Sequence, residues 1–218
     1  MIKFHPFRDT FILLLITASL IACKQNQTTV EVESLEIFKV EGDNQTKKPT
    51  ELSYKEVKFY DNDGYLSQQH FYSVDNKLKS YEVIKRDGNK AVSNYYDSDS
   101  TILAIYHIDL NGKNEVSRKG YDGFTKEHLR SERYTYDASG NRITKEILTT
   151  EDVVTRKFAF TYDAHGNQTG HSVMNTRGKV LNEEKYEIVK RDDENKWLEK
   201  WGYINGKPRS FHRRKVLK

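Results

Sequence analysis

The sequence predicts an all-β domain: an antiparallel up-and-down meander of roughly a dozen short strands. Turn-forming residues recur about every 10 to 14 residues from Leu52 onward. The segments between them, such as 102–108 and 143–147, place apolar residues at every second position, as a half-buried strand does. The chain has 14 tyrosines, 10 phenylalanines and only 3 prolines. This composition suits a sheet with one solvent-exposed face better than a helical bundle. We expect an open curved or partly closed sheet.

The first 22 residues are typical of a bacterial export signal. Lys3 and Arg8 supply positive charge, and an apolar run follows over residues 11–20. That run is roughly ten residues long, about half of what a helix needs to span a bilayer. We therefore expect residues 1–22 to be a signal peptide that is absent from the mature protein.

The signal ends in Leu20-Ile-Ala-Cys23, which resembles the lipobox of bacterial lipoproteins. The resemblance implies that Cys23 carries a palmitate-type lipid on its sulfur, and that the membrane is a partner through this residue. An ordinary signal peptide that happens to contain a cysteine is the alternative. A lipidated Cys23, the only cysteine, forms no disulfide and provides no thiol nucleophile. Lys24 follows it, and resemblance to enterobacterial lipoproteins implies an outer membrane location, on the periplasmic face or at the surface.

The rest of the chain is expected to form one domain. Residues 23–29 comprise the lipidated cysteine and a polar tether, and residues 30–218 form a single β-repeat domain. Its first strand is predicted over 30–40, and a loop over 41–50 because that segment contains glycine, aspartate, asparagine and proline. No amphipathic helix is convincing; the best candidate is 123–134.

The central unit is the segment 158–167, in which Phe158, Phe160 and Tyr162 share one face of an extended chain and a turn follows. A second copy spans 134–141. Aspartate bonds back to nearby backbone N–H groups, and glycine and asparagine tolerate the left-handed conformation of a tight reversal. The predicted turn residues are Asp137, Gly140, Asn141, Asp163, Gly166 and Asn167. Gly170 lies in the following strand, where we expect a valine to cost less than at the turn glycines.

The two halves of the chain contain similar segments. Tyr81-Glu-Val-Ile-Lys-Arg-Asp87 in the first half matches Tyr186-Glu-Ile-Val-Lys-Arg-Asp192 in the second. The Tyr-Asp-x-x-Gly-Asn units resemble the YD repeats of the RHS class, which bacterial surface proteins and toxin shells string into long β-sheets. The resemblance is good over 134–167 and fair over 59–88 and 160–192. It implies a β-sheet architecture, and the chain is too short for an enclosing shell.

The sequence offers no complete catalytic or metal-binding motif. Aspartate-rich segments at 61–64 and 109–115 resemble fragments of calcium loops but lack the full ligand spacing. Six histidines remain after the signal; His165 and His171 flank one turn, and no third residue completes a zinc set. We expect no catalytic residue, no metal and no cofactor. The three-residue segment Asp99-Ser-Thr101 resembles an O-glycosylation motif of exported Bacteroidetes proteins, which leaves modification of Ser100 open.

Two groups of residues are candidate ligand contacts. A basic group near the C-terminus suits anionic lipid or an acidic glycan, and its alternative role is a charged edge strand that resists aggregation. That group is Arg209, Arg213, Arg214 and Lys215. An aromatic group suits stacking on sugars, and its alternative role is core packing. Its members are Trp197, Trp201 and Tyr203.

These observations favour a lipid-anchored cell-envelope protein that acts as a non-enzymatic binding or structural scaffold. The alternatives are a glycan-associated accessory lipoprotein and a hydrolase with a dispersed site. Expected partners are the membrane, an envelope protein or a glycan; nucleic acid is not expected for a lipoprotein that faces the periplasm or the outside.

Overall fold

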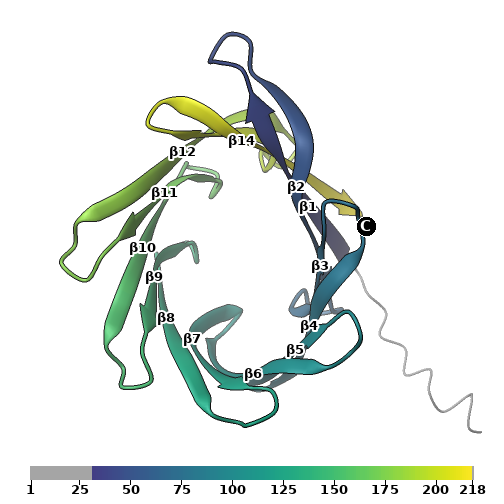
Figure 1. The fold of residues 1–218 in the computed structure, drawn as a ribbon, viewed down its shortest axis with the longest axis vertical. Coiled ribbons are helices and arrows are strands. Elements are labelled where there is room, and N and C mark those ends of the chain that lie inside the picture. The colour runs from purple at the N-terminus through teal and green to yellow at the C-terminus, as the bar shows by residue number, and fades with distance from the viewer. Residues whose placement is uncertain (1–30, 218) are drawn as a thin grey trace, which may run out of the picture.

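The computed structural model describes residues 31–217, so the signal peptide, Cys23 and the tether lie outside the described residues. Within this range the chain forms a closed barrel of fourteen antiparallel strands, each paired with its neighbours in the chain (Figure 1). The prediction of an all-β antiparallel meander is confirmed, with fourteen strands in place of roughly a dozen.

The fourteen strands run in chain order around the barrel. They are β1 (Glu31–Glu41), β2 (Lys48–Tyr60), β3 (Leu66–Tyr72), β4 (Leu78–Asp87), β5 (Lys90–Asp97), β6 (Ile102–Asn111), β7 (Asn114–Asp122), β8 (His128–Tyr136), β9 (Arg142–Leu148), β10 (Val154–Tyr162), β11 (Gln168–Met174), β12 (Val180–Arg191), β13 (Trp197–Ile204) and β14 (Lys207–Leu217). The first strand lies where it was predicted. The predicted loop over 41–50 is shorter, because β2 begins at Lys48. The weak helix candidate over 123–134 is a turn followed by most of β8.

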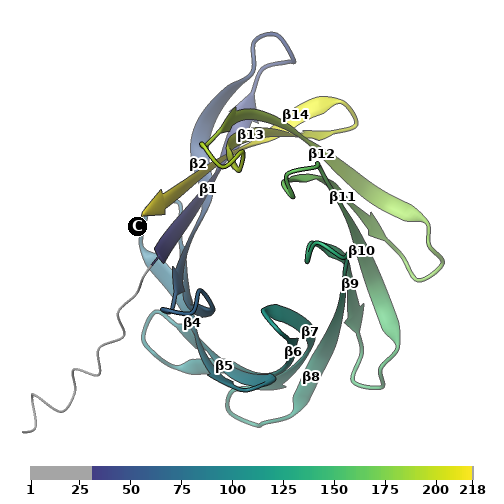
Figure 2. The same ribbon diagram turned by 180° about the vertical axis from the view of Figure 1, so that it is seen from behind.

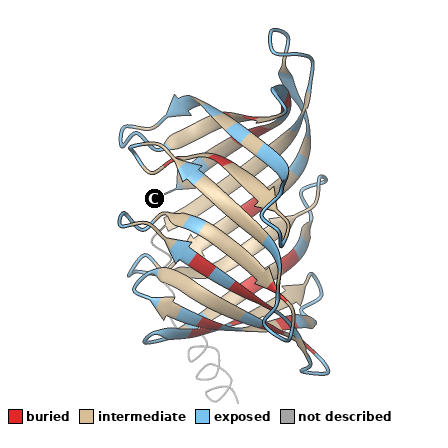
Figure 3. Ribbon diagram, turned by 90° about the vertical axis from the view of Figure 1, so that its left-hand side faces the viewer, coloured by how far each residue is buried: buried red, intermediate tan, exposed pale blue. Residues whose placement is uncertain are grey.

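The prediction of an open or partly closed sheet is wrong, because β14 pairs with β1. Val32 lies opposite Leu217 and Lys39 lies opposite Ser210, with continuous antiparallel register between them. Each described strand therefore has two hydrogen-bonded neighbours, and β14 is not the edge strand that its basic residues suggested. The strands run obliquely around the barrel, the tilt that closure requires (Figure 3).

Aspartate organises the repeat turns as predicted. The backbone N–H groups of His165 and Asn167 both donate to Oδ1 of Asp163, each at 2.9 Å. Gly166 has φ of 74° and Gly140, in the equivalent turn, has φ of 82°. Partial burial raises the pKa of Asp163, but the hydrogen bonds from Asn167 and from Arg191 outweigh it and hold that pKa well below its usual range.

The same five-residue turn recurs around the barrel, with Asp, Ser, Thr or Asn at its first position. In each copy the N–H of the first residue donates to the carbonyl of the fifth. The copies span 61–65, 73–77, 97–101, 137–141, 149–153, 163–167, 175–179 and 192–196. A type I turn followed by a left-handed residue joins antiparallel strands with the correct twist, so one turn type builds most of the hairpins.

The two ends of the barrel differ. Six turns lie at one end, which we call the inward-turn end because several of them bend over the lumen (Figure 2). These turns lie at 61–65, 88–89, 112–113, 137–141, 163–167 and 192–196. β1 begins and β14 ends at this same end, since Glu31 pairs with Tyr60 and Val32 with Leu217. At the opposite end the hairpins splay outward (Figure 1).

Valine at Gly140 or Gly166 is expected to lower the free energy of unfolding by about 1–3 kcal/mol each, because a β-branched side chain is strained at positive φ. A Cβ at Gly140 would meet only the Asn114 side chain, at 3.8 Å, so the loss would come from the backbone conformation. Thermal melts of the two variants check this. Unchanged melting temperatures would show that these glycines do not need the left-handed conformation.

Gly170 cannot accept a side chain, although its place inside a strand suggested that it could. A Cβ there would lie 2.8 Å from the backbone carbonyl oxygen of Glu184 on the neighbouring strand. Real Cβ atoms do not approach a carbonyl oxygen so closely, and the two strands would have to separate. The expectation that Gly170→Val costs less than the turn variants is therefore wrong; Gly170 is required by close backbone approach.

The lumen is lined by alternate residues of every strand. Phe160 and Tyr162 share the inner face with Phe158, as their spacing predicted. Carboxylates recur on this face and are buried: Glu56, Glu82 and Glu132. Each accepts a hydrogen bond from a hydroxyl and faces a basic side chain, so the barrel interior contains paired charges beside its apolar residues.

Candidate functional site

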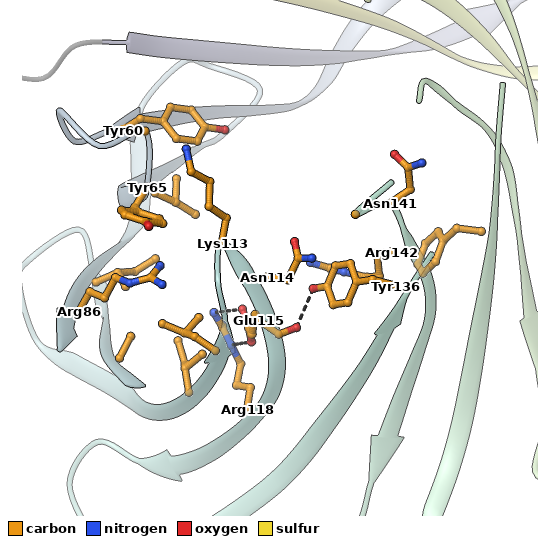
Figure 4. Close-up of a pocket in the computed structure, with 18 of the residues that line it drawn as sticks. Tyr60, Tyr65, Arg86, Lys113, Asn114, Glu115, Arg118, Tyr136, Asn141 and Arg142 are labelled. Carbon is orange, nitrogen blue, oxygen red and sulfur yellow. Dashed lines mark hydrogen bonds and ion pairs between the residues drawn. The ribbon is translucent and has the colours of Figure 1, made fainter. Parts of the chain in front are cut away.

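A cavity of about 580 Å³ lies in the lumen at the inward-turn end (Figure 4). Its size is within the range of small-molecule sites. The lining comes from strands β2 to β11, and it includes Gly64, Lys113 and Gly140 from three turns, so the cavity reaches the mouth of the barrel. Its charged side chains are Arg86, Lys113, Glu115, Arg118 and Arg142.

Three of the four basic residues have no ion pair to an acidic side chain among the described residues. Arg86 donates to the backbone carbonyls of Gly88 and Gly112, and its guanidinium lies 3.8 Å from the centre of the Tyr65 ring. Lys113 donates to a turn carbonyl, that of residue 63, at 3.0 Å. Carbonyls and rings orient these cations without neutralising them, so the mouth of the cavity is positively charged.

Arg118, at the base of the cavity, is neutralised instead. Its guanidinium lies 2.7 Å from Glu115 and 3.1 Å from Glu82. Burial lowers the pKa of Arg118, but the carboxylates of Glu82 and Glu115 outweigh it, so the net shift is upward and the guanidinium stays charged. Arg118 and Glu115 are therefore paired with each other at the base of the cavity. The other charged side chains of the lining are all basic.

Arg142 has an unsatisfied donor. Its Nε is buried and has no hydrogen-bond partner among the described residues. The guanidinium lies 4.5 Å from the centre of the Tyr134 ring, and this contact helps to orient it. A buried N–H without an acceptor costs about 1–3 kcal/mol.

The uncharged lining is of two kinds. Aromatic rings come from the repeat units, and two of their hydroxyls brace the wall: Tyr136 donates to the carbonyl of Glu115 (2.6 Å) and Tyr162 to that of Arg142 (2.8 Å). Aliphatic side chains line the wall formed by β3 to β6. These are Leu66, Ile84, Ala91, Ile108 and Leu110.

A second polar cluster fills another part of the lumen. Ser210 donates to Glu184 (3.0 Å) and also contacts Nε2 of His212 (2.8 Å). Because the hydroxyl proton goes to the carboxylate, the imidazole donates to Ser210 and cannot remove its proton. The arrangement therefore differs from a catalytic triad, in which the histidine lies between serine and acid.

The pKa values of two basic groups in this cluster are lowered. Burial lowers the pKa of His212 to about 3, with Lys200 and His171 adding repulsion. Burial also lowers the pKa of Lys200 to about 8, against a smaller upward effect of Glu184. The Lys200 amine lies 3.8 Å from the Tyr186 ring centre. This cluster does not line the 580 Å³ cavity.

The aromatic residues singled out in the sequence do not form one surface. Trp201 and Tyr203 lie on the outer face around Lys47, whose amine is 5.3 Å and 5.1 Å from their ring centres. Trp197 instead contacts Lys200, which faces the lumen, at 4.4 Å. The rings that do converge are those of the cavity (Figure 4).

The basic residues near the C-terminus are divided between the two faces of β14 and are mostly paired. Arg214 faces Glu33 in the lumen (3.2 Å), whereas on the outer face Arg213 meets Glu199 (3.1 Å). Lys215 lies 3.6 Å from Glu36, on the outer face. Arg209 is exposed. They do not form one cationic patch.

Of the repeat-turn residues, Gly140 and Asn141 line the cavity, whereas Asp137 and Asp163 are used within their turns. The sequence did not single out Arg86, Lys113 or Arg142. Each lies within or beside a turn at the inward-turn end, and that position next to a repeat turn is the signal that would have found them.

Several other features predicted from the sequence fall within the described residues. His171 faces the lumen beside Glu184, whereas His165 is exposed in its turn, so the two do not act together. Ser100 is exposed and its hydroxyl accepts a hydrogen bond from Tyr81 (2.9 Å). Between residues 31 and 217 no group of three or more metal-ligating side chains is arranged to hold an ion. No helix in that range is both long and apolar enough to cross a membrane.

No family model matches the chain, and no curated protein matches its sequence. Among solved structures, a porin-like protein from Bacteroides uniformis is similar over 88% of this chain and 97% of its own, at 10% identity and a TM-score of 0.49. A putative outer membrane lipoprotein-sorting protein domain from Vibrio parahaemolyticus aligns over 94% and 91%, at 10% identity and a TM-score of 0.31.

The complex TcdB2-TccC3, without its hypervariable C-terminal region, aligns over 85% of this chain and 11% of its own, at 14% identity and a TM-score of 0.31. At these identities and scores a likeness does not carry function from one protein to another. The features of this chain that bear on its ligand are therefore those of its own residues.

Proposed function

We propose that this chain is a lipid-anchored, non-enzymatic cell-envelope protein that binds a small anionic ligand in the cavity at the inward-turn end. The observation that carries the proposal is the convergence of Arg86, Lys113 and Arg142, all without acidic partners among the described residues, on a 580 Å³ cavity lined by aromatic and aliphatic side chains. Cationic groups over a concave apolar surface are the usual composition of a site for an organic anion.

The lining favours binding over catalysis. Its only carboxylate, Glu115, is bonded to Arg118 at 2.7 Å, and no histidine is among the described residues that line it. Hydrolysis needs a free base or nucleophile next to the substrate. In the Ser210 cluster the hydrogen bonds do not activate the serine, so this cluster does not support the hydrolase alternative.

The outer wall suits contact with water. Ion pairs lie along it, including Arg133 with Glu146 (3.3 Å) and Arg213 with Glu199 (3.1 Å). Charged side chains facing hydrocarbon cost about 2–4 kcal/mol each at the midplane of a bilayer. In the proposal the barrel stands in the aqueous phase and the lipid on Cys23 holds it to the membrane. A partner of the outer wall, as in the scaffold hypothesis, is compatible with a ligand in the lumen.

The anchor is tested by Cys23→Ser. The full-length variant is expected to leave the membrane fraction and to incorporate no labelled palmitate, because no other cysteine is present. Fractionation and labelling of cells that express each form measure this. A variant that stays in the membrane fraction, with a wild type that takes up no label, would refute the lipid anchor.

The cavity is tested with 8-anilinonaphthalene-1-sulfonate, an aromatic anion that fluoresces in apolar sites. We expect one saturable site on the chain from Lys24 onward, which contains the whole closed barrel. Leu110→Trp fills the cavity and is expected to weaken this binding at least tenfold.

Val92→Trp is the matched control. Val92 lies on the neighbouring strand but on the outer face, where it is 41% exposed, so the same bulk is added outside the cavity. Circular dichroism confirms that both variants fold. Equal affinities for wild type, Leu110→Trp and Val92→Trp would show that the lumen is not the binding site.

A further inference from the structure

The aliphatic side chains and Arg142 lie on different sides of the cavity. Ile84, Ile108 and Leu110 belong to β4 and β6, the side that also carries Arg86 and Lys113, whereas Arg142 belongs to β9 and lies beside Tyr136 (Figure 4). A ligand that satisfies both sides has one apolar part and one anionic part. An apolar chain can pack against the aliphatic side chains, and the cations that have no ion pair can bind an anionic group.

Sugars are poorly matched to this cavity. A sugar ring needs several polar partners for its hydroxyls, and three amide side chains line the cavity: Asn114, Asn141 and Gln168. Asn141 already donates its amide to Asp137 (2.9 Å), and Gln168 donates to the carbonyl of Gly170 (3.3 Å). Hydroxyls placed against Ile108 and its aliphatic neighbours would lose their hydrogen bonds to water without replacement.

The start of β1 lies beside the cavity. Tyr60 lines the cavity and is paired with Glu31, the first residue of β1. Only eight residue steps separate Glu31 from Cys23, and an extended chain covers at most about 3.5 Å per step. If Cys23 carries the lipid, the mouth of the cavity is held within roughly 30 Å of the membrane surface.

We propose that the ligand is an amphipathic anion, an alkyl or acyl chain that bears a carboxylate or a phosphate, taken up at the membrane surface. The apolar chain lies against Ile84, Ile108 and Leu110, and the guanidinium of Arg142, which has no ion pair among the described residues, pairs with the anionic group. Lys113 and Arg86 add positive charge at the mouth. This inference rests on the proposed function, because it names the ligand class of the same cavity.

Isothermal titration of the chain from Lys24 onward tests it with four probes below their micellar concentrations: decanoate, decyl phosphate, 1-decanol and glucuronate. We expect decanoate and decyl phosphate each to bind at least tenfold more tightly than decanol, and glucuronate to bind more weakly than either anion. Arg142→Gln is expected to reduce the affinity for the anions at least tenfold and to leave decanol unchanged. Arg142→Lys, which keeps the charge, is expected to restore part of the preference.

Arg133→Gln is the control, because Arg133 lies on the outer face beside Glu146 and is expected to change nothing. Co-sedimentation with phosphatidylglycerol and phosphatidylcholine vesicles separates two sources of the anion. Arg142-dependent binding to phosphatidylglycerol vesicles identifies a lipid in the bilayer, and binding of the monomeric probes alone identifies a free amphiphile. Both results support the inference.

Two results would overturn it. Tighter binding of glucuronate than of decanoate would show a sugar-acid site. Equal affinities for decanol and decanoate, unaffected by Arg142→Gln, would show that the cations do not select the ligand. In both cases binding of the fluorescent probe that depends on Leu110 would still support a lumen site, so failure of this inference is distinct from failure of the proposed function.

Discussion

The free energy of unfolding is expected to fall by about 3 kcal/mol as the pH is lowered from 6.5 to 4.5, largely because of His212. This side chain is 8% exposed, contacts Ser210 at 2.8 Å and lies near Lys200. Burial, together with Lys200 and His171, lowers the pKa of His212 to about 3 in the folded state, against an ordinary value near 6.5.

The sign follows from which state binds the proton. Between these two pKa values the unfolded chain takes up a proton at His212 and the folded chain does not, so acid favours unfolding. The contribution is fully present above pH 6.5 and is lost as the pH falls towards 3. Each unit of pH in this window is worth about 1.4 kcal/mol.

Urea titrations at several pH values measure this dependence. His212→Gln is expected to flatten the profile between pH 6.5 and 4.5, whatever its own stability, because glutamine does not titrate. His165→Gln, which replaces an exposed turn histidine, is expected to leave the slope unchanged. Identical slopes for the wild type and His212→Gln would contradict the assignment.

Glu132→Gln is expected to destabilise the barrel by about 3 kcal/mol, because it breaks a buried charge pair from one side. Glu132 is 4% exposed, and its carboxylate lies 2.8 Å from Lys145 and 3.3 Å from Arg130. Burial raises its pKa, but the hydrogen bonds from Lys145 and from Tyr134 outweigh this and the net shift is downward. The expected loss in the free energy of unfolding is at the low end of the range for breaking a buried ion pair, because Arg130 is half exposed.

Glu146→Gln is the control on the neighbouring strand. Glu146 also meets two basic residues, Arg133 at 3.3 Å and Lys157 at 3.4 Å, but on the outer face. Exposed pairs are worth about 0–1 kcal/mol, so this variant is expected to change little. Urea unfolding at pH 7 compares the two. Equal losses would show that the charges in the lumen are as well solvated as those outside.

Much of the fold was predictable because it depends on local rules. Alternation in 158–162 placed Phe158, Phe160 and Tyr162 on one face, and they share it in the barrel. Asp163 and Gly166 defined a turn whose geometry follows from short-range hydrogen bonds and from the φ that glycine tolerates. Such features need no knowledge of distant residues.

Closure of the sheet was not predictable from these rules. It depends on β14 meeting β1, strands at opposite ends of the described chain, with Val32 opposite Leu217. Strand tilt and strand number determine whether the first and last strands pair. The alternation of apolar and polar residues along a strand specifies neither. The role of Gly170 was hidden for the same reason, since the atom that excludes a side chain there is the carbonyl oxygen of Glu184 on another strand.

The sequence by itself determined which residues share a face, and only the tertiary structure decided which face turns inward. The two matching segments show this: Glu82 of the first is buried and bonded to Arg118 in the lumen, whereas Glu187 of the second is bonded to Lys47 outside. A bulge shifts the alternation by one residue and exchanges the faces. The cavity has the same origin, because its cations come from different hairpins and converge only when the barrel closes.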